Sequence, residues 1–183
     1  MESRPPILTT ARTRLRLPRL DDGPFMLRLL NDPEFVRFTG DRGIRDLEGA
    51  ESYIEQKMLG LQRQHGFTLY LVERLTDEEP LGICGLVKRP NLDAPDIGFG
   101  YLTEHSGQGI GTETAKAVLE FAYTHLGHRR IYGITQPDNA ASMRLLEKIG
   151  LKRQRTQHFP GLAERQVVFR IQLRPLPRTH RAH

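Results

Sequence analysis

Hydrophobic positions recur with two different periods along this chain, and each period predicts a different secondary-structure element. Leu15 and Leu17 alternate with arginines, and near-continuous apolar runs at 67–74 and 81–89 flank a polar turn. Both features are typical of strands, and the second predicts a hairpin. Over residues 46–66, apolar side chains recur in steps of three and four, which predicts an amphipathic helix. The chain therefore combines strands and helices in a mixed α/β class.

The densest pattern lies between residues 96 and 123 and predicts a strand, a glycine loop and a helix in that order. Apolar side chains alternate with glycine or aspartate over 96–102, so one face of this strand is almost bare. Two glycines on that face indicate a bulge, or the close approach of another backbone or of a ligand. Glycines at 107, 109 and 111 then precede a helical pattern that continues to Tyr123.

The segments that follow complete the predicted fold. Residues 128–136 predict a strand, and a helix follows that Asp138 or Asn139 caps and Gly150 ends. Residues 151–159 and 165–173 then predict a closing pair of strands.

The two ends of the chain differ from its middle. The first ten residues are expected to be a frayed lead-in, before Asp21 or Asp22 caps a short helix. No internal repeat or linker interrupts the pattern. We therefore expect a single domain over residues 1–173, followed by a basic, disordered tail over residues 174–183.

Composition narrows the class of protein. Hydrophobic residues make up 38% and charged residues 27% of the 183 residues, as in an ordinary globular domain. No apolar run approaches the roughly 20 residues that span a bilayer, so no membrane partner is expected. The single cysteine, Cys84, lies in an apolar run, which favours a core position and a cytoplasmic location.

The formal net charge of +5 raises the question of nucleic acid. Arg174, Arg178 and Arg181 in the predicted tail have no acidic neighbours to offset them, so the folded part is only mildly basic. No basic stripe is interleaved with aromatic residues, which makes nucleic acid the less favoured partner except through a ribosomal substrate. A modest positive field also suits a polyanionic cosubstrate.

Three kinds of glycine loop can be compared with residues 107–113. The ATPase-type loop G-x-x-x-x-G-K-[ST] is absent, and the dinucleotide fingerprint would need glycine where Thr112 or Thr114 stands. A loop of small residues before a helix can still admit a phosphate to the unpaired N–H groups of the helix N-terminus. The alternative is a tight turn between a strand and a helix.

Three segments together resemble the GNAT superfamily of N-acetyltransferases, in the branch that modifies protein N-termini and includes the ribosomal-protein acetyltransferases. They are T-A-R-T-R-L-R-L-P-R-L-D-D-G, D-I-G-F-G-Y-L with its G-Q-G-I-G-T-E loop, and N-A-A-S-M-R-L-L-E-K-I-G-L. The resemblance covers about residues 8–173. It implies a strongly twisted mixed sheet of six or seven strands, flanked by helices on both faces.

The resemblance also implies where the cosubstrate acetyl-CoA binds. The strands at 96–102 and 130–135 are expected to splay apart and admit the pantetheine arm. Backbone N–H groups of the loop would hold the diphosphate, and one near the end of the first strand would stabilise an oxyanion. The residues expected to bind the cosubstrate are Tyr101, Leu102, Gln108, Gly109, Ile110, Gly111, Thr112 and Asn139.

The chain departs from the superfamily pattern at two positions. Ser106 stands where a long polar residue is expected, so phosphate affinity would depend more on backbone donors. Leu146 stands where many members carry a tyrosine that protonates the departing thiolate. The resemblance suggests Ser142 as the substitute proton donor. The alternative is that Ser142 is simply a small helix residue packed against the sheet. Asn139 could contact pantetheine or simply cap the helix.

Asp96 is the candidate general base, because relatives often carry an acidic residue at this place in the strand. The alternative is a strand-entry residue paired with an arginine. Deprotonating an α-amine at pH 7 costs about 1 kcal/mol, against about 4.6 kcal/mol for a lysine. Since no strong base is evident, a protein or peptide N-terminal α-amine is the favoured acceptor.

Two further classes of function stay open from the sequence. One is a small-molecule acetyltransferase acting on a polyamine, amino sugar or drug, and the other is a CoA-binding module without catalysis. No metal is expected, because His125 and His128 have no carboxylate or cysteine at ligand spacing. Exposed strand edges would permit a homodimer.

Overall fold

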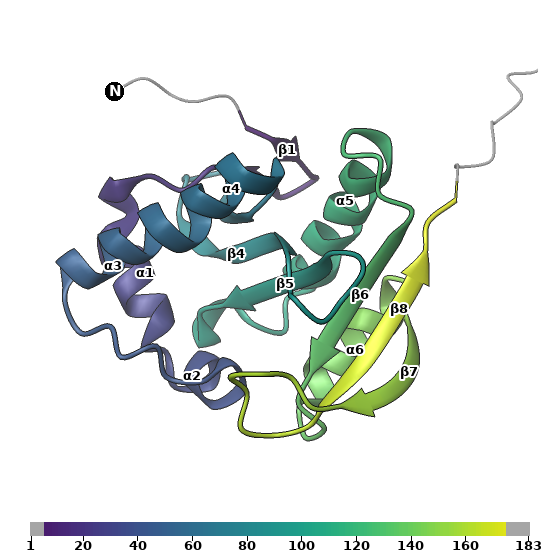
Figure 1. Ribbon diagram of the computed structural model, residues 1–183. Helices are drawn as coiled ribbons and strands as arrows, with labels where there is room; N and C mark the ends of the chain where they lie inside the picture. Colours follow the sequence, from purple (N-terminus) through teal and green to yellow (C-terminus); the bar gives the residue numbers. More distant parts are fainter. Residues whose placement is uncertain (1–5, 175–183) are drawn as a thin grey trace, which may run out of the picture.

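The alternating segments assemble into one eight-stranded sheet in the order β1-β2-β3-β4-β5-β6-β8-β7 (Figure 1). The structure is a computed structural model, and it describes residues 6–174. The strands are β1 (Leu8–Thr9), β2 (Thr13–Arg16), β3 (Leu69–Arg74), β4 (Pro80–Val87), β5 (Asp96–Tyr101), β6 (Arg130–Thr135), β7 (Lys152–Gln157) and β8 (Gln166–Gln172). The β5–β6 pair is parallel and the other neighbours are antiparallel, so the predicted mixed sheet is confirmed.

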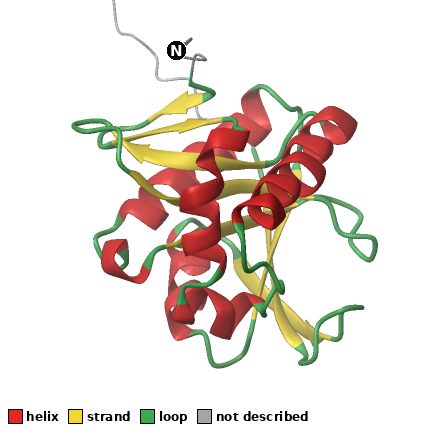
Figure 2. Ribbon diagram, turned by 90° about the vertical axis from the view of Figure 1, so that its left-hand side faces the viewer, coloured by secondary structure: helices red, strands yellow, loops and turns green. Residues whose placement is uncertain are grey.

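Helices cover both faces of this sheet, as predicted (Figure 2). They are α1 (Gly23–Leu30), α2 (Pro33–Thr39), α3 (Leu47–Tyr53), α4 (Gly60–His65), α5 (Ile110–Thr124) and α6 (Ala140–Lys148). A π-helical turn, Ile54–Leu59, joins α3 to α4, so the predicted helix over 46–66 is continuous. The Asp46 carboxylate caps its start and Gly66 ends it.

Two apolar clusters hold these layers together. Neighbouring residues of a strand point to opposite faces, and accordingly Ile83 packs with α1–α3 while Cys84 packs with α5 and α6. Cys84 is fully buried, and burial raises the pKa of its thiol to about 12. The predicted core role of this cysteine is therefore confirmed.

The N-terminal segment differs from its prediction. Leu8 pairs with Leu15 in the ladder between β1 and β2, so Leu8 and Thr9 of the predicted frayed lead-in form a strand, and β1 makes the sheet one strand larger than the largest number expected. Residues 1–5 of that lead-in lie outside the described residues. Asp22 stands at the N-cap of α1, but its side chain makes no capping bond. Its carboxylate binds the buried Arg16 guanidinium instead, at 2.7 and 2.8 Å.

Strands β5 and β6 separate soon after they meet. Strand β5 is paired with β4 along its whole length, from Val87↔Asp96 to Gly82↔Tyr101. With β6 it shares only the pair Asp96↔Tyr132. The edges of the two strands therefore diverge beyond Asp96, as the resemblance implied.

Residues 6–174 contain no helix long and apolar enough to cross a membrane. The predicted tail lies outside the described residues except for Arg174.

Candidate active site

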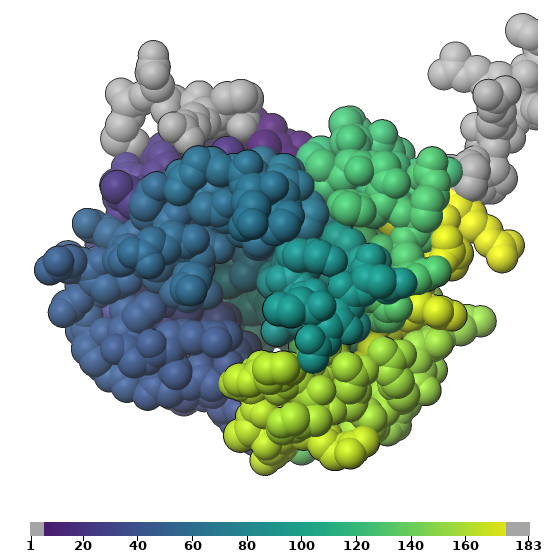
Figure 3. Space-filling view, in the orientation of Figure 1, coloured from purple at the N-terminus to yellow at the C-terminus, as the bar shows by residue number. Residues whose placement is uncertain are grey.

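A groove with a volume of about 1590 Å³ opens where β5 and β6 diverge. Its floor comes from the ends of these strands, and its sides come from α2, α3, α6, the glycine loop and the β7–β8 loop. Figure 3 shows a recess on the face where residues 40–60 and the β7–β8 loop approach each other. Of the predicted site residues, the groove wall includes Asp96, Tyr101, Gln108, Gly109, Ile110, Gly111, Thr112, Asn139 and Ser142.

The glycine loop presents unpaired backbone donors at one end of this groove. Gly107 and Gly109 adopt left-handed conformations with φ of 76° and 78°, which L side chains rarely adopt. Gly109 is the N-cap of α5 and offers no side-chain cap. The N–H groups of residues 110–112 have no carbonyl one turn earlier to accept them, and the helix dipole adds partial positive charge. This arrangement suits a phosphate.

The backbone of β5 determines which N–H groups face the groove. The Leu102 N–H donates to Leu81 O at 3.1 Å, so it is not available to an oxyanion. In an antiparallel ladder, hydrogen-bonded and non-hydrogen-bonded pairs alternate. The N–H groups of Phe99 and Tyr101 therefore point away from β4, toward the gap beside β6. Tyr101 remains the candidate oxyanion donor of the predicted pair.

The Tyr101 side chain has a structural role. Its hydroxyl hydrogen-bonds Thr114 Oγ1 on the first turns of α5. Burial raises the pKa of this phenol well above its ordinary value, so it stays protonated at neutral pH. The ring fixes α5, and with it the glycine loop, to the end of β5.

Asp96 fits both roles that the sequence left open, a general base and a strand-entry residue paired with an arginine. Its carboxylate is buried, with 2% exposed, and Oδ2 accepts a hydrogen bond from Arg89 Nε at 3.0 Å. Oδ1 has no hydrogen-bond partner among residues 6–174. Burial raises the pKa of Asp96 to about 6, although the Arg89 charge opposes this. A carboxylate of that pKa is mostly ionised at pH 7 and can accept a proton.

Asn139 and Ser142 lie at the first turn of α6. Asn139 Oδ1 accepts the Ser142 backbone N–H at 3.0 Å, so the capping role of Asn139 is confirmed. Ser142 is half-buried in the groove wall, and its hydroxyl makes no hydrogen bond to any described residue. Leu146 is buried, and a Cβ added at Gly133 would lie 2.6 Å from its Cδ2. This position therefore packs against β6 and offers no proton donor.

Packing explains the bare face of β5. A Cβ added at Gly100 would lie 2.4 Å from Phe35 Cε2, and one added at Gly98 would lie 3.0 Å from Leu69 Cδ2. Side chains of this protein, rather than a ligand, occupy the space over both glycines. The pantetheine arm would instead run along the open edge of the strand. Phe35 gave no signal in the sequence, because only the tertiary fold brings α2 over β5.

The groove wall also contains residues that the sequence did not single out. Tyr53, at the end of α3, lines the wall, and burial raises the pKa of its hydroxyl above the ordinary value. Arg37 on α2 lies near Asp138, with 3.6 Å between Nη2 and Oδ2, so the two sides of the groove approach each other at this point.

One group of potential metal ligands occurs in the described part of the chain: Glu79, Glu104 and His105. The His105 Nε2 atom lies 3.3 and 3.5 Å from carboxylate oxygens of Glu79 and Glu104. Arg74 and Arg28 bind the other oxygens of these two carboxylates. Arginines of the protein therefore already neutralise the carboxylates of this cluster.

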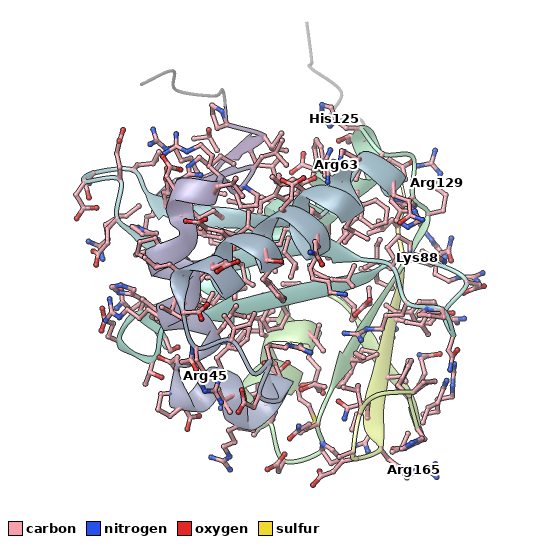
Figure 4. The ribbon with its side chains drawn as sticks, turned by 60° about the vertical axis from the view of Figure 1, so that its left-hand side comes forward. Arg45, Arg63, Lys88, His125, Arg129 and Arg165 are labelled. Carbon is pink, nitrogen blue, oxygen red and sulfur yellow. The ribbon has the colours of Figure 1, made fainter. Side chains whose placement is uncertain are left out.

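Basic side chains are spread over several elements. Figure 4 shows Arg63, Lys88, His125 and Arg129 toward one side of the molecule, with Arg45 and Arg165 away from them. Many other arginines are paired with carboxylates, as Arg14 is with Glu73.

Known proteins resemble this chain in sequence. The profile described as Acetyltransferase (GNAT) domain matches residues 12–152. The uncharacterized protein YkkB of Bacillus subtilis (strain 168) is 28% identical over 152 residues, covering 81% of this chain and 87% of YkkB. The uncharacterized N-acetyltransferase p20 of Bacillus licheniformis is 26% identical over 151 residues, covering 80% of this chain and 83% of p20.

A solved structure resembles this chain in fold. RimL, a ribosomal L7/L12 alpha-N-protein acetyltransferase in complex with coenzyme A, superposes with a TM-score of 0.78 at 17% identity. The superposition covers 92% of this chain and 98% of RimL. RimL therefore shares the fold described above over most of this chain.

Proposed function

Because the chain belongs to the GNAT acetyltransferase family, we propose that it transfers the acetyl group of acetyl-CoA directly to a protein or peptide N-terminal α-amine. The expected enzyme class, an N-acetyltransferase, is confirmed by the family. The main support for acetyl-CoA as the acetyl donor is the divergence of β5 and β6 next to the glycine loop. It provides an open strand edge for the pantetheine amides and a helix N-terminus for the diphosphate.

The donor would lie across the groove from loop to strand. Backbone N–H groups of residues 108–112 bind the diphosphate, and the arm extends along the edge of β5 toward Asp96. The Tyr101 N–H points into the same gap and donates to the thioester carbonyl oxygen as negative charge develops there. The Asn139 side-chain amide keeps its NH₂ group for the pantetheine while its oxygen caps α6.

The reaction itself requires one proton acceptor and one proton donor. The neutral amine attacks the thioester carbon, a C–N bond forms, and the resulting oxyanion collapses to expel the CoA thiolate. Asp96 accepts the proton that the amine nitrogen loses, directly or through a water. The Ser142 hydroxyl makes no hydrogen bond to the described residues. It donates a proton to the thiolate and regains one from solvent.

The acid strength of Asp96 favours an α-amine as the acceptor. With a pKa of about 6, its carboxylate lies within about two units of a terminal amine, but more than four units below a lysine side chain. RimL, similar in fold, is named for acetylation of a protein α-amine. We therefore propose a protein N-terminus, with ribosomal proteins as the first class to examine in the cytoplasm.

A substrate panel tests this function. Acetyl-CoA is supplied with a peptide bearing a free α-amine, the same peptide blocked at its N-terminus but carrying a lysine, spermidine, and an amino sugar, and thiol release is followed. We expect turnover with the first peptide and a mass increase on its N-terminal residue. Turnover only with spermidine or the sugar would establish a small-molecule enzyme, and binding without any turnover would indicate a CoA-binding module.

A further inference from the structure

Arg12 connects the turn between β1 and β2 to the glycine loop, although about a hundred residues separate them in sequence. Its Nη1 donates to Gln108 O at 2.9 Å. Its Nε donates to Glu113 Oε2 at 2.7 Å, and its backbone N–H donates to Oε1 of the same carboxylate at 2.9 Å. The guanidinium is therefore held in one orientation against the loop.

One end of this guanidinium has no acceptor among the described residues. Nη2 lies 3.5 Å from the position that a Cβ would take on Gly109. The Arg12 side chain is 49% exposed, and Gly109, beside which Nη2 lies, belongs to the groove wall. A cationic donor thus lies beside the N-cap of α5, where the first backbone N–H groups of the helix have no partner within it.

The loop needs such a cation from another part of the chain. Residues 103–112 contain no lysine or arginine. Ser106, which stands where the superfamily carries a long polar residue, turns its hydroxyl inward and donates to Leu102 O at 3.3 Å. The loop itself therefore has only backbone dipoles to offer a phosphate.

Glu113 makes the need for this cation greater. It lies in the first turn of α5, where its carboxylate would repel a phosphate bound at the helix N-terminus. Burial would raise its pKa, but hydrogen bonds from Thr10 and Arg12 outweigh burial and hold the pKa below its ordinary value. The carboxylate is thus ionised. Its ion pair with Arg12 neutralises its charge and holds the guanidinium in place.

We propose that Arg12 is a phosphate-binding residue of the donor site, an inference that rests on the proposed function. Nε and Nη1 fix the guanidinium to the loop, and Nη2 donates to a phosphate oxygen of coenzyme A. The geometry fits either the diphosphate or the 3′-phosphate, because both present the same kind of oxygen. Arg12 thereby takes the role that Ser106 cannot fill.

Calorimetric titration of three ligands into wild-type protein, Arg12→Gln and Arg12→Lys tests this proposal. The ligands are CoA, dephospho-CoA, which lacks the 3′-phosphate, and acetyl-pantetheine, which has no phosphate. We expect Arg12→Gln to weaken CoA binding about 10- to 100-fold, the range for a hydrogen bond to a charged group. Arg12→Lys should recover part of the loss, since it keeps the charge but not the fork geometry.

The other two ligands identify the phosphate. If the loss disappears with dephospho-CoA, Arg12 binds the 3′-phosphate, and if it persists there but disappears with acetyl-pantetheine, Arg12 binds the diphosphate. Arg14→Gln is the matched control, because Arg14 follows two residues later, in β2, but pairs with Glu73 and Glu78 away from the loop. This control should leave all three affinities unchanged.

Two results would overturn the proposal. Unchanged CoA affinity in Arg12→Gln would show that the guanidinium does not meet a phosphate. An equal loss for all three ligands would show that Arg12 only shapes the loop. Failure of the wild-type protein to bind CoA at all would instead contradict the proposed function, so the two failures are distinguishable.

Discussion

At the scale of single residues, Asp96 shows how burial can prepare a side chain for proton transfer. A fully solvated aspartate would be too weak a base to take a proton from an ammonium group efficiently. Burial makes the ionised form less favourable, and the ion pair with Arg89 limits that effect. The result is a carboxylate whose pKa of about 6 lies near the working pH.

This raised pKa predicts an unusual pH dependence of stability. The folded state binds the Asp96 proton more tightly than the unfolded state, where the pKa is about 3.9. The contribution is therefore present at low pH and lost as the pH rises through about 6. From pH 4 to pH 7, the unfolding free energy of wild-type protein should fall relative to Asp96→Asn by up to about 3 kcal/mol.

Urea unfolding across this pH range provides the measurement. Asp93→Asn is a control of opposite sign, because a hydrogen bond from Tyr132 lowers the pKa of Asp93. Wild-type protein should gain stability relative to that variant as the pH rises. Parallel profiles for wild-type and Asp96→Asn would show that the pKa of the carboxyl is not perturbed.

If Asp96 is the base, Asp96→Asn should also lower kcat about 10²- to 10⁴-fold.

The sequence identified several site residues by type and position, but backbone direction decided between them. Tyr101 and Leu102 were equivalent candidates in the sequence, and only the ladder with β4 shows that the Leu102 N–H is already used. Asn139 was identifiable because capping is a local property. Arg12 and Arg89 were not, because their partners are set by the tertiary fold.

At the scale of elements, the unit of strand β5, glycine loop and helix α5 organises the site. Its parts were predictable, since alternation and helical spacing are strong local signals. Strand β1 was missed because two residues are too short for any period to appear. The glycines of β5 were recognised, but their partner, Phe35, could not be, because it comes from a short helix far away in sequence.

The loop predicts a difference between two glycines with similar backbones. Gly109 and Gly127 have φ of 78° and 73°, and an added Cβ would meet at most Arg12 Nη2, 3.5 Å away at Gly109. Replacement by alanine should therefore lower the unfolding free energy of each variant similarly, by about 1–2 kcal/mol. Only Gly109→Ala should weaken CoA binding, by at least about tenfold, since only Gly109 lies in the groove wall.

Thermal unfolding and CoA titration of both variants give the answer. If Gly127→Ala weakens CoA binding as much as Gly109→Ala does, the effect arises from stability alone. If Gly109→Ala binds CoA normally, the loop has a structural role and the diphosphate binds elsewhere.

At the scale of the whole molecule, function follows from one irregularity in the sheet. Six of the seven strand pairings extend over two or more residue pairs, whereas the parallel pairing β5–β6 is held at a single position. The mixed class of the sheet, the helices on both of its faces and the divergence of its two middle strands could be inferred from the sequence through the family resemblance. The width and lining of the groove could not, because α2, α3 and the β7–β8 loop complete it from distant segments.

Calorimetric titration of CoA into the wild-type protein tests the central claim most directly. We expect saturable binding of one CoA per chain, with much weaker binding of pantetheine, because the diphosphate meets the N-terminus of α5. Absence of heat and of saturation at millimolar CoA, with protein that unfolds cooperatively, would contradict it.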